Sequence, residues 1–222
     1  FQVLSIKANQ LANYLRDALG RLPAGHTGQI VAVCFSRVNV EVATAFLAVL
    51  KLGGAIHFVE PKLGIEVNNK RLKKISPDLV LLDEDNAHLS HDIEEFETLV
   101  LSEHQHQIDH AAKTSIVTVG SRNSACVFCS SGTTGEPKVI TMPMLPLSNL
   151  TRSASEELHL CPESRLIQLA RRNFDAVVHE LAISLGSRSL FSPSFPPLYY
   201  TSLLLPFLPL LYPPPPPPTP PP

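Results

Sequence analysis

The sequence has no marked excess of charge of one sign, no long apolar run and no cysteine-rich framework. Its 18 basic residues nearly balance its 20 acidic ones, so we expect neither nucleic acid nor an anionic membrane as a partner. The leucine-rich residues 199–212 are interrupted by Pro206 and Pro209, and they fall short of the ~20 residues that a membrane-spanning helix needs. We expect no signal peptide, and the four cysteines form no disulfide pattern. We therefore expect a reducing compartment, the cytoplasm.

The spacing of cysteines and histidines raises the question of a metal site. Cys126 and Cys129 are spaced like a metal half-site without a second CxxC motif, and two small apolar residues near a strand end give the same pattern. His104 and His106 could also ligate a metal. They lie within the polar residues 85–123, where no apolar framework would hold ligands in place. We predict no metal site, and a solvated, poorly ordered insertion over 85–123.

Apolar residues follow two periodicities along the chain. Helical spacing and short continuous apolar runs alternate. The expected helices cover residues 5–22, 39–52, 68–76 and 144–158, and the expected strands cover 29–35, 55–59, 79–82 and 166–170. Strands that alternate with helices at this spacing indicate a parallel sheet with right-handed crossovers. The expected fold class is α/β, with parallel sheets flanked by helices.

The most informative stretch is residues 129–138, CSSGTTGEPK, which follows a short apolar run typical of a buried strand. Its two glycines let the backbone turn tightly and bring N–H groups close to an anion. Its hydroxyl side chains add neutral donors, and its lysine adds a mobile positive charge. The spacing differs from the Walker A motif, and an ordinary surface loop can have a similar composition. The predicted phosphate-binding residues are Ser130, Ser131, Gly132, Thr133, Thr134, Gly135 and Lys138.

This stretch resembles the phosphate-binding loop of the adenylate-forming (AMP-dependent synthetase/ligase) superfamily, TSGTTGxPKG after Tyr or Phe. The superfamily includes acyl-CoA synthetases, luciferases and the adenylation domains of nonribosomal peptide synthetases. The chain matches the pattern at residues 131–135 and 137–138, and it departs from it at Cys129, Ser130 and Val139. The resemblance implies that the loop binds the β- and γ-phosphates of ATP, with Lys138 as a catalytic residue.

Three further stretches resemble the same family. Residues 50–61, LKLGGAIHFVEP, are similar to the motif LKAGxAYVPIDP, and residues 9–15 are similar to its NxLAxxL helix. Residues 173–180, NFDAVVHE, are similar to FDxSxWE, whose Asp pairs with the substrate's ammonium group in amino-acid-activating domains. The resemblance makes Asp175 the substrate-binding candidate, although a lone Asp at a helix start can simply be an N-cap. Residues 139–143 resemble the β-alanine-activating branch, acyl-CoA synthetase family member 4.

The composition changes near residue 186. We expect a partial N-terminal adenylation domain over residues 1–186 and a disordered, proline-rich tail over 187–222, which could also be an unspliced or frame-shifted product. Residues 213–218 are all proline and should extend as polyproline II, a ligand for SH3 or WW domains. The first residue is Phe rather than Met, which suggests a fragment.

The resemblance implies a reaction in two steps. A carboxylic acid attacks the α-phosphorus of Mg²⁺-bound ATP to give an acyl-adenylate and pyrophosphate, and a thiol of CoA or of a carrier protein's phosphopantetheine then takes the acyl group. The family's adenine, Mg²⁺ and ribose motifs and its second catalytic Lys lie further along and have no counterpart in this sequence. We therefore expect amino-acid activation as the family function, with this chain inactive alone. The alternatives are an acyl-CoA synthetase for a fatty or aryl acid, and a non-enzymatic protein whose tail binds a partner.

Overall fold

A mostly parallel sheet organises the chain. The computed structural model describes residues 1–20, 29–36, 39–93, 95–116, 123–131, 136–170 and 175–192. Six strands form the main sheet in the order β4-β3-β1-β2-β5-β6, and a second sheet pairs β7 with β8. All neighbours in the main sheet are parallel except β6, which runs antiparallel to β5. The strands of the main sheet are β1 Ile30–Cys34, β2 Ala55–Phe58, β3 Leu79–Leu82, β4 Thr98–Val100, β5 Ser124–Ser131 and β6 Pro137–Pro143. The α/β expectation is confirmed.

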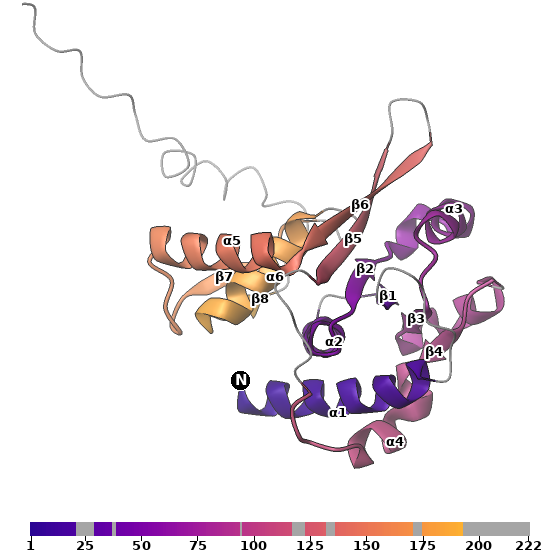
Figure 1. Ribbon diagram of the computed structural model, residues 1–222, viewed down its shortest axis with the longest axis horizontal. Coiled ribbons are helices and arrows are strands. Elements are labelled where there is room, and N and C mark those ends of the chain that lie inside the picture. The colour runs from indigo at the N-terminus through magenta and orange to yellow at the C-terminus, as the bar shows by residue number, and fades with distance from the viewer. Residues whose placement is uncertain are drawn as a thin grey trace, which may run out of the picture.

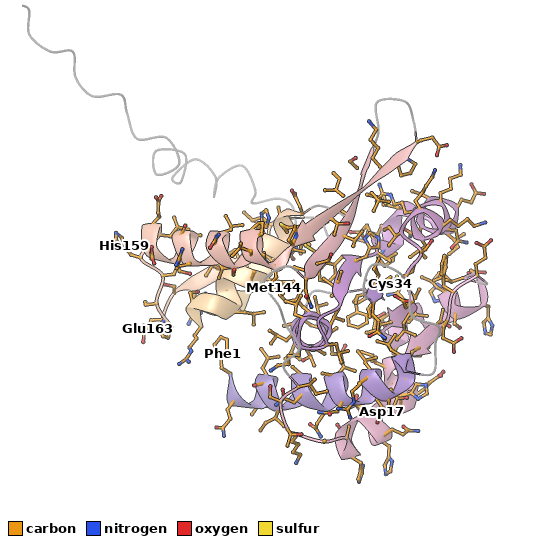
Figure 2. All side chains as sticks on the ribbon, viewed as in Figure 1. Phe1, Asp17, Cys34, Met144, His159 and Glu163 are labelled. Carbon is orange, nitrogen blue, oxygen red and sulfur yellow. The ribbon has the colours of Figure 1, made fainter. Side chains whose placement is uncertain are left out.

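The central strands are apolar throughout because both of their faces are buried. On β1, Val31 and Val33 belong to the core on one face, whereas Ala32 and Cys34 belong to the core on the other. Helices α1 (Gln2–Leu19), α2 (Val40–Lys51), α5 (Met144–Glu157) and α6 (Ala176–Ser187) contribute to the first core. Helix α3 (Ile65–Ile75) covers the opposite face (Figure 1). Figure 2 shows Cys34 inside this sandwich, with Phe1, Asp17 and Glu163 at its periphery.

The turn from α2 into β2 explains why residues 50–61 contain two consecutive glycines, Gly53 and Gly54. Asn39 caps the start of α2, since its side chain accepts hydrogen bonds from the backbone N–H groups of Glu41 and Val42. After the helix, Gly53 takes a φ of 75°, a conformation that favours glycine. A Cβ on Gly54 would lie 2.9 Å from the carbonyl oxygen of Gln29. This stretch therefore has a structural role.

The last described elements form a second βαβ unit. β7 (Arg165–Ile167) pairs in parallel with β8 (Leu190–Ser192), and α6 is the crossover between them. β7 begins one residue earlier than predicted and ends at Ile167, three residues short of the predicted end. β8 lies inside the stretch that we expected to be a disordered tail, so regular structure extends further along the chain than expected. Residues 193–222, including the proline run, lie outside the described residues.

The expectation of poor order over residues 85–123 was wrong for 85–93 and 95–116. This part contains the 3-10 helices η2 (Glu84–His91) and η3 (Leu101–His104), the strand β4, and the short helix α4 (Gln105–His110). The apolar side chains that anchor it are Ile93, Leu99, Val100 and Ile108, all buried. These few residues outweigh the polar composition because β4 also pairs with β3 along its length. Residues 117–122 lie outside the described part.

Candidate functional site

The predicted phosphate-binding loop connects two antiparallel strands. β5 runs on beyond the predicted strand to Ser131, and the chain returns as β6 from Pro137. Ser130 pairs with Lys138, and Ser131 pairs with Pro137. Gly132, Thr133, Thr134, Gly135 and the side chain of Ser131 lie outside the described residues. The loop therefore leads into a strand, unlike a Walker A loop, which leads into a helix.

Ser130 and Lys138 share one face of this hairpin. Directly opposed residues of an antiparallel pair point to the same side of the sheet, and Ser130 is half-buried while Lys138 is exposed. Pairing is regular from Cys126 to Ser131, so alternation places Cys126, Phe128 and Ser130 on one face. Cys126 and Phe128 belong to the core that contains the α6 residues Val177, Val178 and Leu181. The Ser130–Lys138 pair thus faces the side of the sheet on which α6 lies (Figure 1).

The two cysteines of the CxxC motif lie on opposite faces of β5. Cys126 belongs to the core on the α6 side, whereas Cys129 packs with Ile75 of α3. Burial, reinforced by the charge of Asp175, raises the pKa of the Cys126 thiol to about 12, and burial also raises the pKa of Cys129. The half-site interpretation fails, since side chains on opposite faces cannot ligate one ion together. The chain's four cysteines form no disulfide in the described structure.

Asp175 stands at the N-terminus of α6, beside β5. Its backbone carbonyl accepts hydrogen bonds from Val178 N and His179 N, at 2.9 and 3.3 Å. Its side chain makes no capping hydrogen bond, so the N-cap interpretation does not account for the carboxylate. The carboxylate is close enough to Cys126 to raise the pKa of that thiol. Along β5, Cys126 and Ser130 are roughly 13 Å apart at the usual rise per residue, so the substrate and phosphate candidates lie near opposite ends of one strand face.

Glu180 is a residue whose role the sequence did not reveal. Its Oε1 accepts hydrogen bonds from the backbone N–H groups of Leu169 and Ala170, both at 3.0 Å, and Oε2 lies 3.3 Å from the second N–H group. Burial raises the pKa of Glu180, although these two hydrogen bonds oppose the shift. The sequence signal was its place in the FDxSxWE-like motif, which gave the residue type but not its partners.

His104 and His106, whose spacing raised the question of a metal site, contact other side chains. His104 Nδ1 lies 2.8 Å from the Tyr14 hydroxyl. His106 stacks on His110 with ring centroids 4.3 Å apart, and His110 Nδ1 donates to the carbonyl oxygen of His106. Within the described ranges, no group of three or more His, Cys, Asp or Glu residues is arranged to hold a metal ion. The family resemblance implies Mg²⁺, which proteins usually hold through one or two carboxylates together with nucleotide phosphates and water; no Mg²⁺ ligand is assigned among the described residues.

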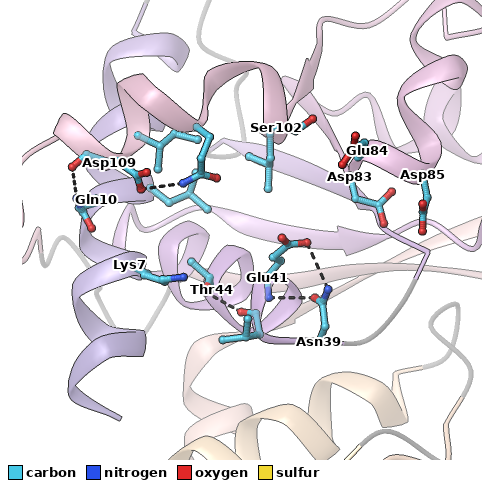
Figure 3. Close-up of a pocket in the computed structure, with 15 residues that line it drawn as sticks. Lys7, Gln10, Asn39, Glu41, Thr44, Asp83, Glu84, Asp85, Ser102 and Asp109 are labelled. Carbon is cyan, nitrogen blue, oxygen red and sulfur yellow. Dashed lines mark hydrogen bonds between the residues drawn. The ribbon is translucent and has the colours of Figure 1, made fainter.

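A cavity of about 600 Å³ lies at the carboxyl ends of β1 and β3 (Figure 3). In the sheet, β2 lies on one side of β1 and β3 lies on the other. Open α/β sheets commonly bind ligands at such a topological switch point. Lys7, Glu41, Asp83 and Asp109 are among its lining residues. Asp83 is already used by the fold, because it accepts from the backbone N–H groups of Ser36 and Asn86. Of the predicted phosphate and substrate residues whose side chains the structure describes, Ser130, Lys138 and Asp175, none lines this cavity.

Comparison with known proteins identifies the family. Residues 1–205 match the family model of the AMP-binding enzymes. The chain therefore belongs to the AMP-binding enzyme family, and the resemblance to adenylate-forming enzymes is confirmed.

The chain spans only a small share of the length of the proteins that it matches. Nonribosomal peptide synthetase resC of Aspergillus sclerotiorum is 27% identical over 191 residues, which cover 83% of this chain and 14% of the relative. Tyrocidine synthase 2 of Brevibacillus parabrevis is 32% identical over 187 residues, 82% of this chain and 5% of the relative. The nonribosomal peptide synthetase FmoA3, solved with α-methyl-L-serine-AMP, has a TM-score of 0.73 at 21% identity over 88% of this chain and 20% of that protein.

No described helix is both long and apolar enough to cross a membrane. The proline-rich stretch for which we expected an SH3 or WW partner lies outside the described residues. That partner stays a prediction.

Proposed function

We propose that the chain carries the ATP-phosphate and substrate-ammonium parts of an enzyme that activates an amino acid as an acyl-adenylate. The observation that supports this most strongly is the shared face of the β5–β6 hairpin: Ser130 and Lys138 lie at one end of it, and Asp175 lies beside Cys126 near the other end. A carboxylic acid and the phosphates of ATP must lie next to each other for adenylate formation. One face of β5 offers both groups a place.

Lys138 is the proposed catalytic residue of the phosphate site. A lysine ammonium donates up to three hydrogen bonds, and its bonds to phosphate oxygens are charge-assisted and therefore strong. Neutralising negative charge on the departing pyrophosphate would favour the transition state more than the ground state. Ser130 adds a neutral hydroxyl donor opposite it, and we assign the rest of the cradle to Ser131, Gly132, Thr133, Thr134 and Gly135.

Asp175 is the proposed partner of the substrate's ammonium group. Its carboxylate makes no capping bond to its own helix, so it can accept from a ligand. The FmoA3 structure contains an amino-acid adenylate, and resC is a nonribosomal peptide synthetase; both names favour an amino acid. The family resemblance makes a phosphopantetheine thiol of a carrier protein or CoA the proposed acceptor, and the free cysteines favour the cytoplasm as the proposed location. The proposal assigns Mg²⁺ to none of the described residues.

We further propose that residues 1–222 bind ATP but do not catalyse adenylate formation by themselves. The chain covers 14% of resC and 5% of tyrocidine synthase 2. The counterparts of the family's adenine, ribose and second lysine motifs are not in the sequence. A site with phosphate donors but no adenine pocket would bind the triphosphate through its charge and gain little from the base.

The experiment is to measure ATP, AMP and inorganic triphosphate binding to the purified chain by calorimetry, and amino-acid-dependent exchange of labelled pyrophosphate into ATP. We expect ATP and triphosphate to bind with similar affinity, AMP to bind more weakly, and no exchange with any amino acid. Failure to bind ATP or triphosphate would contradict the phosphate site. Exchange by the chain alone would contradict its proposed inactivity, while leaving the site assignment intact.

A further inference from the structure

The carboxylate of Glu180, in α6, forms hydrogen bonds with the backbone that follows β7. Its contacts to the Leu169 and Ala170 N–H groups span ten or more residues of sequence. The side chain is half-buried. The described residues form three ion pairs, and none of them involves Glu180. A half-buried carboxylate costs stability unless its contacts compensate, and within the described ranges its compensating contacts are these two backbone N–H groups.

Two side chains form hydrogen bonds with the backbone just after β7. The Glu180 carboxylate accepts from the N–H groups of Leu169 and Ala170, and the Gln168 side chain donates to the carbonyl oxygen of Ala170. Gln168 is itself buried. The chain next enters α6 at Asp175, and Glu180 lies in the second turn of the same helix. The Glu180 carboxylate therefore connects the residues that follow β7 to the first two turns of α6.

We propose that Glu180 is a positioning residue for substrate recognition, which holds the first turn of α6, and with it Asp175, in place beside β5. This inference rests on the proposed role of Asp175 as the partner of the substrate's ammonium group. A carboxylate suits the task because a single oxygen can accept from both N–H groups while the second reinforces one of them. Without it, two backbone donors at the strand exit would lose their acceptor, and the helix start would lose its tie to β7.

The first test needs no ligand. In Glu180→Ala, we expect amide hydrogen exchange at Val178 and His179, whose N–H groups bond to the Asp175 carbonyl, to accelerate by roughly fivefold. Glu180→Gln keeps a carbonyl oxygen of the same reach and should stay close to the wild-type rates. Glu157→Ala, which removes an exposed carboxylate from α5, is the matched control. Unchanged exchange at Val178 and His179 in Glu180→Ala would overturn the proposal.

The second test separates positioning from general loss of structure. Calorimetry of the full chain would compare binding of a panel of amino acids and of ATP in wild type, Glu180→Ala and Glu180→Gln. We expect Glu180→Ala to weaken amino-acid binding about tenfold with ATP binding unchanged, and Glu180→Gln to restore amino-acid binding. Equal weakening of both ligands would mean that Glu180 serves only the fold. If the wild type binds no amino acid, the proposed role of Asp175 fails, and the exchange measurement decides the positioning of α6 by itself.

Discussion

Ser130 and Lys138 are directly opposite each other on β5 and β6, so the hydroxyl and the ammonium group project from the same face at the end of the hairpin where the two strands are connected. The residues between 131 and 136 join these two strands. An anion bound at this end of the hairpin, as proposed, would therefore meet a neutral donor from one strand and a positive charge from the other. This pairing gives the phosphate-binding proposal its geometry.

Replacing Lys138 should weaken ATP binding. Loss of a charge-assisted bond to phosphate corresponds to about a ten- to hundredfold lower affinity, so we expect that change in Lys138→Ala by calorimetry, and a smaller one in Ser130→Ala. Lys113→Ala, which removes another exposed lysine, controls for net charge. Equal affinities in Lys138→Ala and Lys113→Ala would show that the hairpin lysine does not contact the nucleotide.

Replacing Asp175 should remove the preference for an ammonium group. We expect Asp175→Asn to bind an amino acid about tenfold more weakly and to leave binding of the matching acid without its amino group unchanged. Asp17→Asn alters a carboxylate that pairs with Arg16 on the surface and should change neither ligand. If Asp175→Asn retains the wild-type ratio between the two acids, the ammonium group is recognised elsewhere.

Buried His57 should make the protein less stable in acid. Its Nδ1 donates to the carbonyl oxygen of Val127 at 2.9 Å. Burial is the main cause that lowers its pKa to about 4; the Val127 hydrogen bond opposes the shift and the nearby charge of Arg71 adds to it. Because the folded pKa lies below that of the unfolded chain, about 6.5, the unfolded state takes up the proton first as the pH falls. The stabilisation that comes from keeping His57 neutral is therefore fully present above pH 6.5 and is lost as the pH falls from 6.5 to about 4.

Urea unfolding at pH 7 and pH 4.5 tests this. Titration of His57 should remove about 2 kcal/mol of unfolding free energy between these two pH values. His57→Gln does not titrate in this range, so its loss should be smaller by about that amount, and the comparison cancels the carboxylates common to both proteins. Identical pH dependence in the two proteins would mean that His57 does not remain neutral and buried.

Thiol labelling should distinguish the cysteines. Cys161 is exposed, while Cys34, Cys126 and Cys129 are buried, and a thiol with a pKa near that of Cys126 contains almost no reactive thiolate at neutral pH. We expect a disulfide reagent to modify one thiol rapidly in the native chain and the others only after unfolding. Cys161→Ser should abolish the rapid phase. Rapid labelling of Cys126 in that variant would show that β5 is not covered by α6.

Particular elements show how far sequence reasoning reached. β1 and β2 were predicted within a few residues, because strands buried on both faces are continuous apolar runs. β4 was missed, because its three residues, Thr98–Val100, are too short for a periodic signal and stand among polar residues. The contacts of Glu180 were also beyond reach, since Leu169 and Ala170 are ordinary apolar residues whose N–H groups carry no sequence signature.

The sequence by itself determined the family, the α/β class and the residue types of the candidate phosphate-binding loop, because local order and apolar periodicity express these directly. Only the tertiary structure decided which side chains meet. It placed Ser130 opposite Lys138, put Cys126 and Cys129 on opposite faces of β5, and brought Glu180 to the end of β7. Each of these relations depends on strand register and helix packing, which arise from contacts between residues far apart in the chain.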